Sequence, residues 1–337
     1  MGEWNAADFD RYVHAIPLSD YRDVARQLST KLEQSVDAEL NKAQRNQVAA
    51  GPAFDKQMDH THKKSRSADQ VKRCATAHSG GVDSMSDISQ GVIKAEEVAE
   101  AATGVIDSLM NTFSTDASLL NNMTALRQSS EYAYTHSVNT AILSINIAMA
   151  LKLNEKQVRE VGLGALLHNL GMSMVPQQVL NAERKLNGTE LVDVQKHIGY
   201  GLYLLGKFRG LPPTTRIIMY QNKERADGTG YLRRRTKNAT HLFARIVAVA
   251  DVYDAMTTDR PWRKAHHPYR TMEYLLSQAH KKFDAEIITG LLRYMSLFPI
   301  GSFVSLDSGD IARVVHSNFD DFYRPIISIL FDDHRVA

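Results

Sequence analysis

Four residues with metal-binding side chains stand at or near the ends of apolar helical segments: His136, His168, His197 and Asp251. Imidazole nitrogens and carboxylate oxygens are ligands that suit iron, manganese or zinc. Each residue taken alone is weak evidence, because histidines are common in helical cores. As a set, the four are candidates for one metal site, which the chain would have to assemble from several helices.

The stretch VGLGALLHNLGMSMVP, residues 161–176, indicates how one of these side chains is positioned. Its apolar run predicts a buried helix that ends with His168 and Asn169 side by side. Gly171 is typical of a helix end, and Pro176 keeps the helix from resuming. A polar pair at such an end either faces a ligand or caps a packed helix through contacts with backbone and water.

A glycine-rich stretch, DGTGY, occupies residues 227–231. Two glycines within three residues, opened by an aspartate, predict a tight loop. The loop would hold the side chain of Tyr231 at a fixed angle.

A second polar stretch, residues 248–263, reads VADVYDAMTTDRPWR from Val249 onward. It predicts a helix with a buried apolar face on which Asp251 and Asp254 remain polar. Arg260 and Arg263 follow three residues apart, a spacing that suits binding of a phosphate group.

The composition of the 337 residues limits the classes of protein to consider. A formal charge of +2 gives no reason to expect nucleic-acid binding. Cys74 is the single cysteine, which excludes an intramolecular disulfide and fits a reducing compartment. No secretory signal and no apolar run of about 18 residues stand out, so we expect a cytoplasmic protein without a membrane span.

The pattern changes along the chain and predicts three regions. Residues 1–115 form an N-terminal helical or regulatory region, with a polar linker near 41–90 between two periodic helices. The apolar stripe of the first helix (Val24, Leu28, Leu32, Val36 and Leu40) predicts packing against the chain's own core, with a homodimer contact as the alternative.

The remaining chain predicts a mainly α fold with a small β extension. Residues 116–298 form the helical domain, and 299–337 form three short strands joined by an Asp-Ser-Gly turn. Periodic apolar segments of the helical domain lie near 132–152, 158–170, 189–206, 211–223, 241–258 and 268–297.

In order and spacing, DGTGY followed by VADVYDAMTTDRPWR resembles the HD-GYP domain, a branch of the HD metal-dependent phosphohydrolase superfamily. The resemblance covers about residues 122–298 and implies an HD-superfamily helical bundle. Members of this branch hydrolyse the bacterial second messenger cyclic di-GMP. The resemblance places metal ligands at His136, His168, His197 and Asp251, and ligand-binding residues at Tyr231, Arg260 and Arg263.

Several positions depart from the family pattern. The aspartate of the HD pair is replaced by Asn169, and the lysine that follows it by Met172. The two histidines of the HHE motif are replaced by Asn222 and Lys223. Around the loop of residues 224–237, here called the GYP-like loop, Leu232 replaces the proline, and a basic run, Arg233 to Lys237, replaces a glycine-rich turn.

These departures argue against catalysis. The family chemistry needs two metal ions about 3.5–4 Å apart, bridged by a carboxylate. Asn169 offers one neutral oxygen, a much poorer bridge. Lys223 brings an ammonium to the second ion's position, where it would pair with Asp251 or Glu224; the alternative is that Lys223 points to solvent. We expect no catalytic residue set to be intact, and either no cofactor or a single Fe or Mn ion.

We therefore predict a degenerate HD-GYP protein that signals without hydrolysis. It would bind cyclic di-GMP, or dock signalling proteins such as diguanylate cyclases through the GYP-like loop and the N-terminal helices. One alternative is a metal-dependent phosphodiesterase with a remodelled site. A second alternative is an interaction scaffold that binds no nucleotide.

Overall fold

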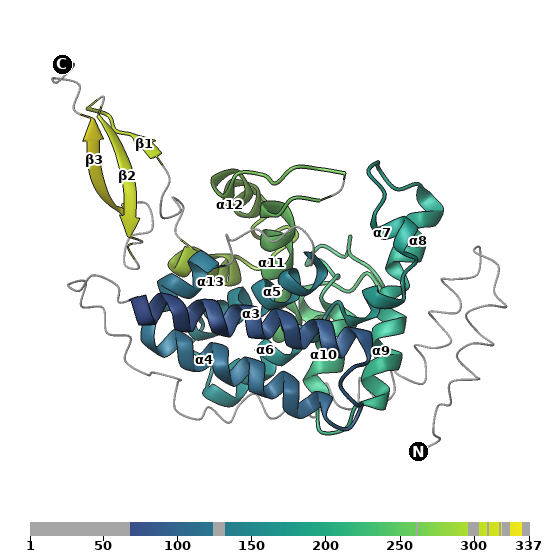
Figure 1. The fold of residues 1–337 in the computed structure, drawn as a ribbon. Helices are drawn as coiled ribbons and strands as arrows, with labels where there is room; N and C mark the ends of the chain where they lie inside the picture. Colours follow the sequence, from purple (N-terminus) through teal and green to yellow (C-terminus); the bar gives the residue numbers. More distant parts are fainter. Residues whose placement is uncertain are drawn as a thin grey trace.

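The computed structural model describes residues 68–123, 132–260, 262–295, 303–308, 310–316, 318 and 324–331. The described part is mostly helical (Figure 1). Its longer helices are α3 (Ala68–Gln90), α4 (Val98–Met123), α5 (Tyr132–Ala150), α6 (Glu155–Leu167), α8 (Gly188–Gln195), α9 (His197–Lys207), α10 (Pro213–Gln221), α11 (Leu242–Thr257), α12 (Pro268–Ser277) and α13 (Ala285–Met295). The short ones are η2 (Leu170–Met174), α7 (Gln177–Leu180) and η3 (Lys237–Ala239).

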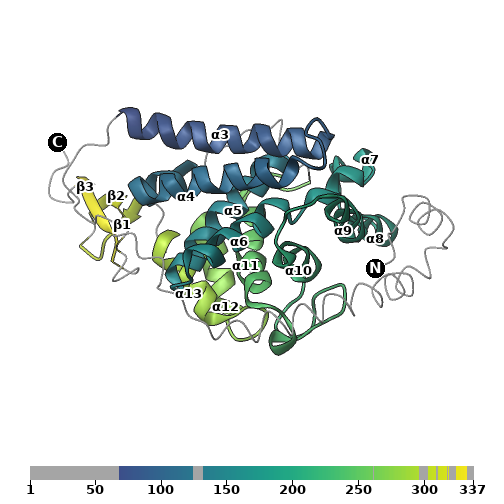
Figure 2. The same ribbon diagram turned by 90° about the horizontal axis from the view of Figure 1, so that it is seen from below.

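Helix α5 is the centre of the bundle. Its residues from Thr135 to Ala148 are buried on every side. Helices α3, α4, α6, α11 and α13 all pack against it (Figures 1 and 2). A polar side chain on α5 can therefore meet side chains from several other helices while remaining out of water.

Local capping fixes where several helices begin. Asn154 and Gln157 form a reciprocal capping box at the start of α6, and Asn187 and Glu190 form another at the start of α8. His241 accepts a hydrogen bond from the backbone of Phe243 at the start of α11. These caps set the register of the helices that carry the polar residues.

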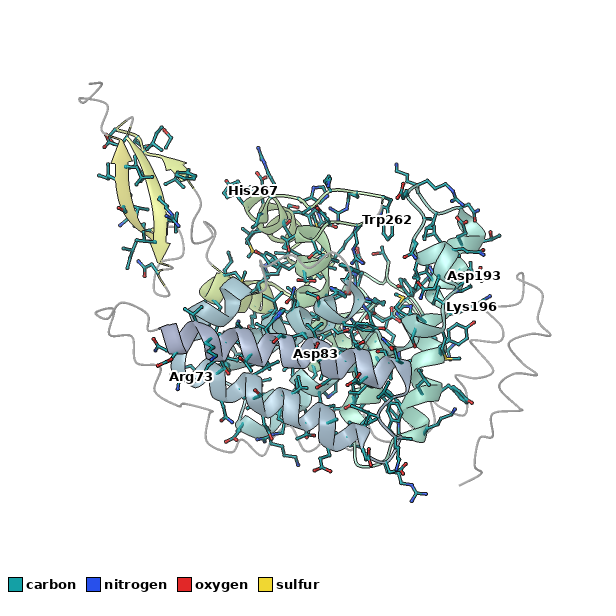
Figure 3. All side chains as sticks on the ribbon, in the orientation of Figure 1. Arg73, Asp83, Asp193, Lys196, Trp262 and His267 are labelled. Carbon is teal, nitrogen blue, oxygen red and sulfur yellow. The ribbon has the colours of Figure 1, made fainter. Side chains whose placement is uncertain are left out.

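Helix α3 corrects the prediction of a polar linker near 41–90. Residues 68–90 form a continuous helix, which packs against α4 and α5. Its buried face is made mainly of small or sulfur-containing residues, among them Cys74 and Met85, whereas charged residues such as Arg73 and Asp83 lie on its outer face (Figure 3). Few large aliphatic residues mark that face, which is why the sequence pattern looks polar. Residues 41–67 lie outside the described residues.

The predicted strands are confirmed. The strands β1 (Phe303–Ser305), β2 (Ile311–His316) and β3 (Ile326–Phe331) form an antiparallel sheet in the order β1-β2-β3. The sheet lies beyond one end of the helical bundle (Figure 1). Ala312 and Val314 are its buried residues among those described.

The mainly α fold is confirmed, with two refinements. The predicted helices at 189–206 and 268–297 are each two helices, α8 with α9 and α12 with α13. One hydrophobic core joins residues from α3 to α13. The predicted boundary between 115 and 116 falls inside α4, and the domain division stays a prediction, as does the stripe at 24–40, which lies outside the described residues.

No helix among the described residues has the length and apolar character needed to span a membrane.

Candidate functional site

Three helices bring metal-binding side chains together in the middle of the bundle. His136 comes from α5, His168 caps the C-terminus of α6, and Asp251 comes from α11. One ligand atom of each lies within 4.8 Å of the others. His136 and His168 meet edge to face with ring centroids 5.4 Å apart. The structure thus assembles three of the four residues that the sequence singled out.

The three candidate histidine ligands, His136, His168 and His197, share one hydrogen-bonding arrangement. Nδ1 of His136 lies 2.6 Å from Asp254, and Nδ1 of His168 and of His197 lie 2.6 Å from the backbone oxygens of Ala165 and Val194. An acceptor oxygen at Nδ1 requires the proton there and leaves Nε2 as the nitrogen that faces the interior. Metal-binding histidines are typically oriented in this way.

The Nε2 atoms of His168 and His197 are buried and have no hydrogen-bond partner among the described residues. Burial lowers the pKa of His168, and burial together with the nearby Lys223 charge lowers the pKa of His197 to about 3. Both imidazoles are therefore neutral, which is the form that binds a metal. His197 does not belong to the compact group of three.

His136 is in a different state. Its Nε2 lies 3.1 Å from Oδ1 of Asp251, so both ring nitrogens face carboxylates. Burial opposes protonation, but the hydrogen bonds to Asp251 and Asp254 outweigh it and raise the pKa of His136.

Lys223 pairs with Asp251, one of the two carboxylates predicted for it. Its Nζ lies 2.7 Å from Oδ2 of Asp251, and 11% of its side chain is exposed. Burial lowers the pKa of Lys223. Burial also opposes ionisation of Asp251, but the Lys223 charge together with His136 and His168 holds the pKa of Asp251 well below its usual range. The other predicted partner, Glu224, contacts the GYP-like loop instead.

Two amides lie next to these residues. Asn222 is fully buried, and neither its oxygen nor its nitrogen has a hydrogen-bond partner among the described residues. The same holds for the side-chain oxygen of Asn169. Unpaired buried amides cost about 1–3 kcal/mol each, so these positions are typical of a site that receives a water molecule or a ligand.

Gly171 explains how the end of α6 reaches α9. A Cβ atom at residue 171 would lie 2.0 Å from the backbone oxygen of His197 and 2.4 Å from the nitrogen of Gly201. Only glycine permits this approach of η2 to α9. Met172, next in the chain, carries no charge into the site.

The donor set fits one divalent ion and not two. His136, His168 and Asp251 offer two imidazole nitrogens and a carboxylate, and the unpaired Nε2 of His168 already faces Asp251 at 3.5 Å. A second ion would need the positions of Asn222 and Lys223. An amide is a poor ligand there, and an ammonium repels a cation.

The GYP-like loop is organised by Glu224. Its carboxylate accepts hydrogen bonds from the backbone nitrogens of Arg233 at 2.7 Å and of Arg235 at 2.9 Å. The backbone nitrogen of Tyr231 donates to the oxygen of Lys223. The loop conformation is therefore tied directly to the residue that pairs with Asp251.

The two arginines predicted to bind phosphate have different surroundings. Both terminal nitrogens of Arg263 donate to backbone oxygens, among them that of Ala255 in α11. Arg260 instead stacks on the ring of Tyr132 at 3.9 Å, and Tyr132 in turn stacks on His136. Arg260 thus connects to the histidine cluster, whereas Arg263 holds the end of α11.

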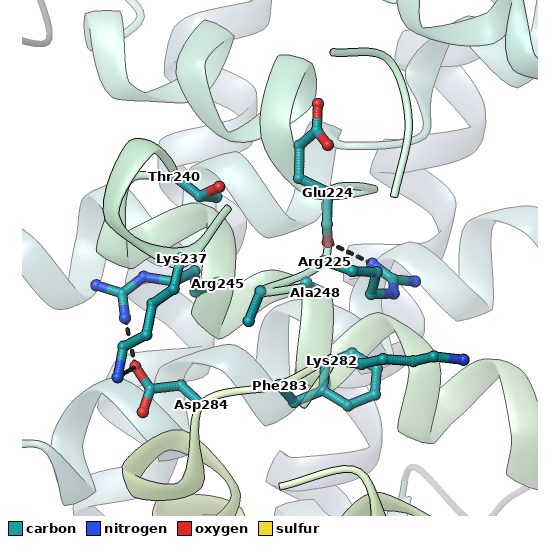
Figure 4. A pocket seen from close by; sticks show the side chains of 10 residues that line it. Glu224, Arg225, Lys237, Thr240, Arg245, Ala248, Lys282, Phe283 and Asp284 are labelled. Atoms are coloured by element: carbon teal, nitrogen blue, oxygen red, sulfur yellow. Dashed lines mark hydrogen bonds and ion pairs between the residues drawn. The ribbon is translucent and has the colours of Figure 1, made fainter. Parts of the chain in front are cut away.

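A separate pocket lies beside the GYP-like loop (Figure 4). Its cavity volume is only about 10 Å³, and its lining includes neither His136 nor His168. On one side Asp284 pairs with Lys237 at 3.0 Å and with Arg245. These ion pairs join the loop, α11 and the start of α13.

Three residues at the cluster have no role that was predicted from the sequence. Asp254 binds His136, Tyr132 stacks on it, and Asn139 donates to Asp254 at 2.9 Å. All three follow helical spacing: Asp254 lies three residues after Asp251, and the other two lie four before and three after His136. A polar or aromatic residue three or four positions from a candidate ligand on the same helix was the signal that could have identified these residues in the sequence.

The family model that matches the chain is described as HD domain and covers residues 118–287. A cyclic di-GMP phosphodiesterase of Pseudomonas aeruginosa is 30% identical over 258 residues, which is 77% of this chain and 61% of that protein. The cyclic di-GMP phosphodiesterase response regulator RpfG of Xanthomonas campestris pv. campestris is 36% identical over 149 residues, 44% of this chain and 39% of that protein. The chain thus spans 39–61% of the length of these two relatives.

A solved structure shares the fold. It is described as an HDG"Y"P protein from Bdellovibrio bacteriovorus, with a TM-score of 0.54 and 19% sequence identity, over 69% of this chain and 73% of that chain.

Proposed function

The chain belongs to the HD domain family, in its HD-GYP branch, and from this premise we propose that it acts in cyclic di-GMP signalling without hydrolysing the nucleotide. The catalytic positions of the branch correspond here to Asn169, Met172, Asn222 and Lys223. The protein would transmit a signal by binding the nucleotide or by docking a partner protein.

The observation that carries the proposal is the ion pair between Lys223 and Asp251, with Nζ 2.7 Å from Oδ2. Two-metal hydrolysis depends on two cations that clamp the phosphate and activate a shared hydroxide. An ammonium supplies the charge of a cation but cannot coordinate and activate water. The ion pair therefore supports a site that can attract phosphate but cannot cleave it.

The residues proposed to hold the nucleotide are Tyr231, Arg260 and Arg263. The stacking of Arg260 on Tyr132 places a guanidinium beside the aromatic ring that packs on His136. A single Fe or Mn ion held by His136, His168 and Asp251 would add positive charge for a phosphate group. The GYP-like loop would be the surface that docks partners such as diguanylate cyclases.

The test measures cleavage and binding on one sample. Protein loaded with Fe²⁺ or Mn²⁺ under reducing conditions is incubated with cyclic di-GMP, and products are separated by chromatography. Calorimetry and metal analysis follow on the same preparation. We expect no linear product and a binding isotherm that Arg260→Ala weakens.

Each other outcome would assign a different function to the protein. Linearisation of cyclic di-GMP at an appreciable rate would show a phosphodiesterase with a remodelled site and overturn the proposal. The absence of both cleavage and binding would leave an interaction scaffold. A useful comparison is the triple variant Asn169→Asp, Asn222→His and Lys223→His, which restores the family residues at the second ion's position.

A further inference from the structure

A chain of hydrogen bonds runs from α3 to the histidine cluster. Nε2 of His78 lies 2.9 Å from Oδ1 of Asn139, and Nδ2 of Asn139 donates to Oδ1 of Asp254 at 2.9 Å. Oδ2 of the same carboxylate lies 2.6 Å from Nδ1 of His136. The bonds continue from His136 to Asp251 and from Asp251 to Lys223.

The direction of each bond is fixed by chemistry. The carboxylate of Asp254 only accepts, so the amide of Asn139 must turn its nitrogen toward it and its oxygen toward α3. That oxygen also only accepts, so His78 must carry a proton on Nε2. All these side chains are buried, and His78 is 7% exposed. Replacing any donor by an acceptor would therefore leave two buried acceptors facing each other.

The close packing of α3 explains why His78 reaches Asn139. One turn after His78, a Cβ atom at Gly81 would lie 3.3 Å from side-chain atoms of both Val105 in α4 and Val138 in α5. The glycine lets α3 approach α5 next to Asn139. The contact between His78 and Asn139 thus depends on how closely α3 is seated.

We infer that His78 and Asn139 are positioning residues through which the seating of α3 sets the orientation of Asp254 and His136. The segment before the HD domain is thereby coupled to the centre of the site. A shift of α3 breaks the first bond, so the amide of Asn139, which donates to the Asp254 carboxylate, is no longer held in place by His78. The Nδ1 proton of His136 then loses the fixed orientation of its acceptor, Asp254.

The experiment uses the full chain, free of metal and nucleotide, labelled with ¹⁵N at the histidine rings. Long-range ¹H–¹⁵N spectra report the tautomer of His136 and the exchange of its Nδ1 proton, and the signal is assigned by its loss in His136→Asn. The informative pair is His78→Gln and His78→Asn. A glutamine nitrogen reaches the position of Nε2, whereas the shorter asparagine nitrogen does not.

We expect His78→Gln to keep the His136 signal and His78→Asn to shift it, with exchange of the Nδ1 proton faster by about ten-fold, as for the loss of one net hydrogen bond. Leu275→Ala, which creates a cavity on α12 and leaves α3 untouched, should lower the melting temperature without moving the signal. Identical spectra for the two His78 variants would overturn the inference, as would a shift in Leu275→Ala equal to that in His78→Asn. Because metal and nucleotide are absent, the result is independent of whether the protein hydrolyses cyclic di-GMP.

Discussion

The site has two halves: one retains metal-binding side chains, and the other contains the residues that replace them. The donor half consists of His136, His168, His197 and Asp251. All three imidazoles have the orientation of metal ligands; His168 and His197 are also neutral, whereas His136 is held between two carboxylates. The replaced half consists of Asn169, Asn222 and Lys223, which offer two neutral amides and an ammonium.

The difference shows what a buried cluster of polar residues requires. The carboxylate of Asp251 lies among apolar helices, where an uncompensated charge costs several kcal/mol. In the replaced half, Lys223 provides the compensating charge from within the chain. The centre is therefore electrostatically stable without a second ion, whatever remains of its chemistry.

Loss of Asp251 tests the link between the two halves most severely. Asp251→Asn leaves the ammonium of Lys223 buried without a counter-ion, so we expect the free energy of unfolding to fall by about 3–5 kcal/mol. Urea unfolding at pH 7 measures the change. Adding Lys223→Met should recover part of the loss, because it removes the unpaired charge. Additive losses in the double variant would show that the two residues do not interact.

Lowering the pH should reduce the stability of the folded protein through the neutral histidines of the donor half. Burial and Lys223 hold the pKa of His197 at about 3 in the folded protein, below the unfolded value of about 6.5. The unfolded state therefore takes up the proton first, and the stabilisation, complete above pH 6.5, is lost as the pH falls toward 3. At pH 5 the loss is about 2 kcal/mol.

Urea midpoints at several pH values, compared with those of His197→Gln, isolate this residue. The variant cannot take up the proton and should show a flatter dependence below pH 6.5. His241 supplies a comparison outside the cluster, because burial lowers its pKa to about 4 while it caps α11. If wild type and His197→Gln lose stability in parallel, His197 does not titrate as the structure indicates.

Metal affinity tests whether Lys223 excludes a cation. Lys223→Met removes a positive charge that is paired with Asp251, so we expect Mn²⁺ to bind at least about ten-fold more tightly. Calorimetric titration with MnCl₂ measures the constant. The control is Lys237→Met, which removes a lysine paired with Asp284 and should leave Mn²⁺ binding unchanged. Equal affinities for wild type and Lys223→Met would show that the charge of Lys223 does not weaken cation binding.

Substitution of the two arginines is expected to have the smallest effects on stability. It distinguishes an arginine that stabilises the fold from one that binds the nucleotide. Arg263→Ala removes hydrogen bonds to backbone oxygens at the end of α11 and should cost about 1–2 kcal/mol. Arg260→Ala removes the stacking on Tyr132 and should cost about 0.5–1 kcal/mol. In cyclic di-GMP titrations we expect the opposite ranking, with Arg260→Ala the more damaging. A larger binding defect for Arg263→Ala would make Arg263, and not Arg260, the main phosphate contact.

The sequence determined the elements of the fold because periodic apolar residues and helix caps are local signals. The longer helices from 132 to 295 and the three strands lie where the pattern predicts them, although two of the predicted helices are each divided in two. The pattern failed for α3, whose buried face includes several small residues, Cys74, Ala77 and Gly81, that do not form a conspicuous apolar stripe. Close packing on α4 and α5, which no local signal reports, stabilises that helix.

Residue identity in the sequence also determined which ligands are kept and which are replaced, since Asn169 and Lys223 can be read directly. Only the tertiary structure decided which partner each side chain contacts. In the folded protein Lys223 pairs with Asp251, and Glu224 binds the loop backbone. Arg263 donates to backbone oxygens at the end of α11. His78 is connected to Asp254 through Asn139. The reason is physical: these partners are far apart in the chain, and their choice depends on distances of a few tenths of an ångström between packed helices.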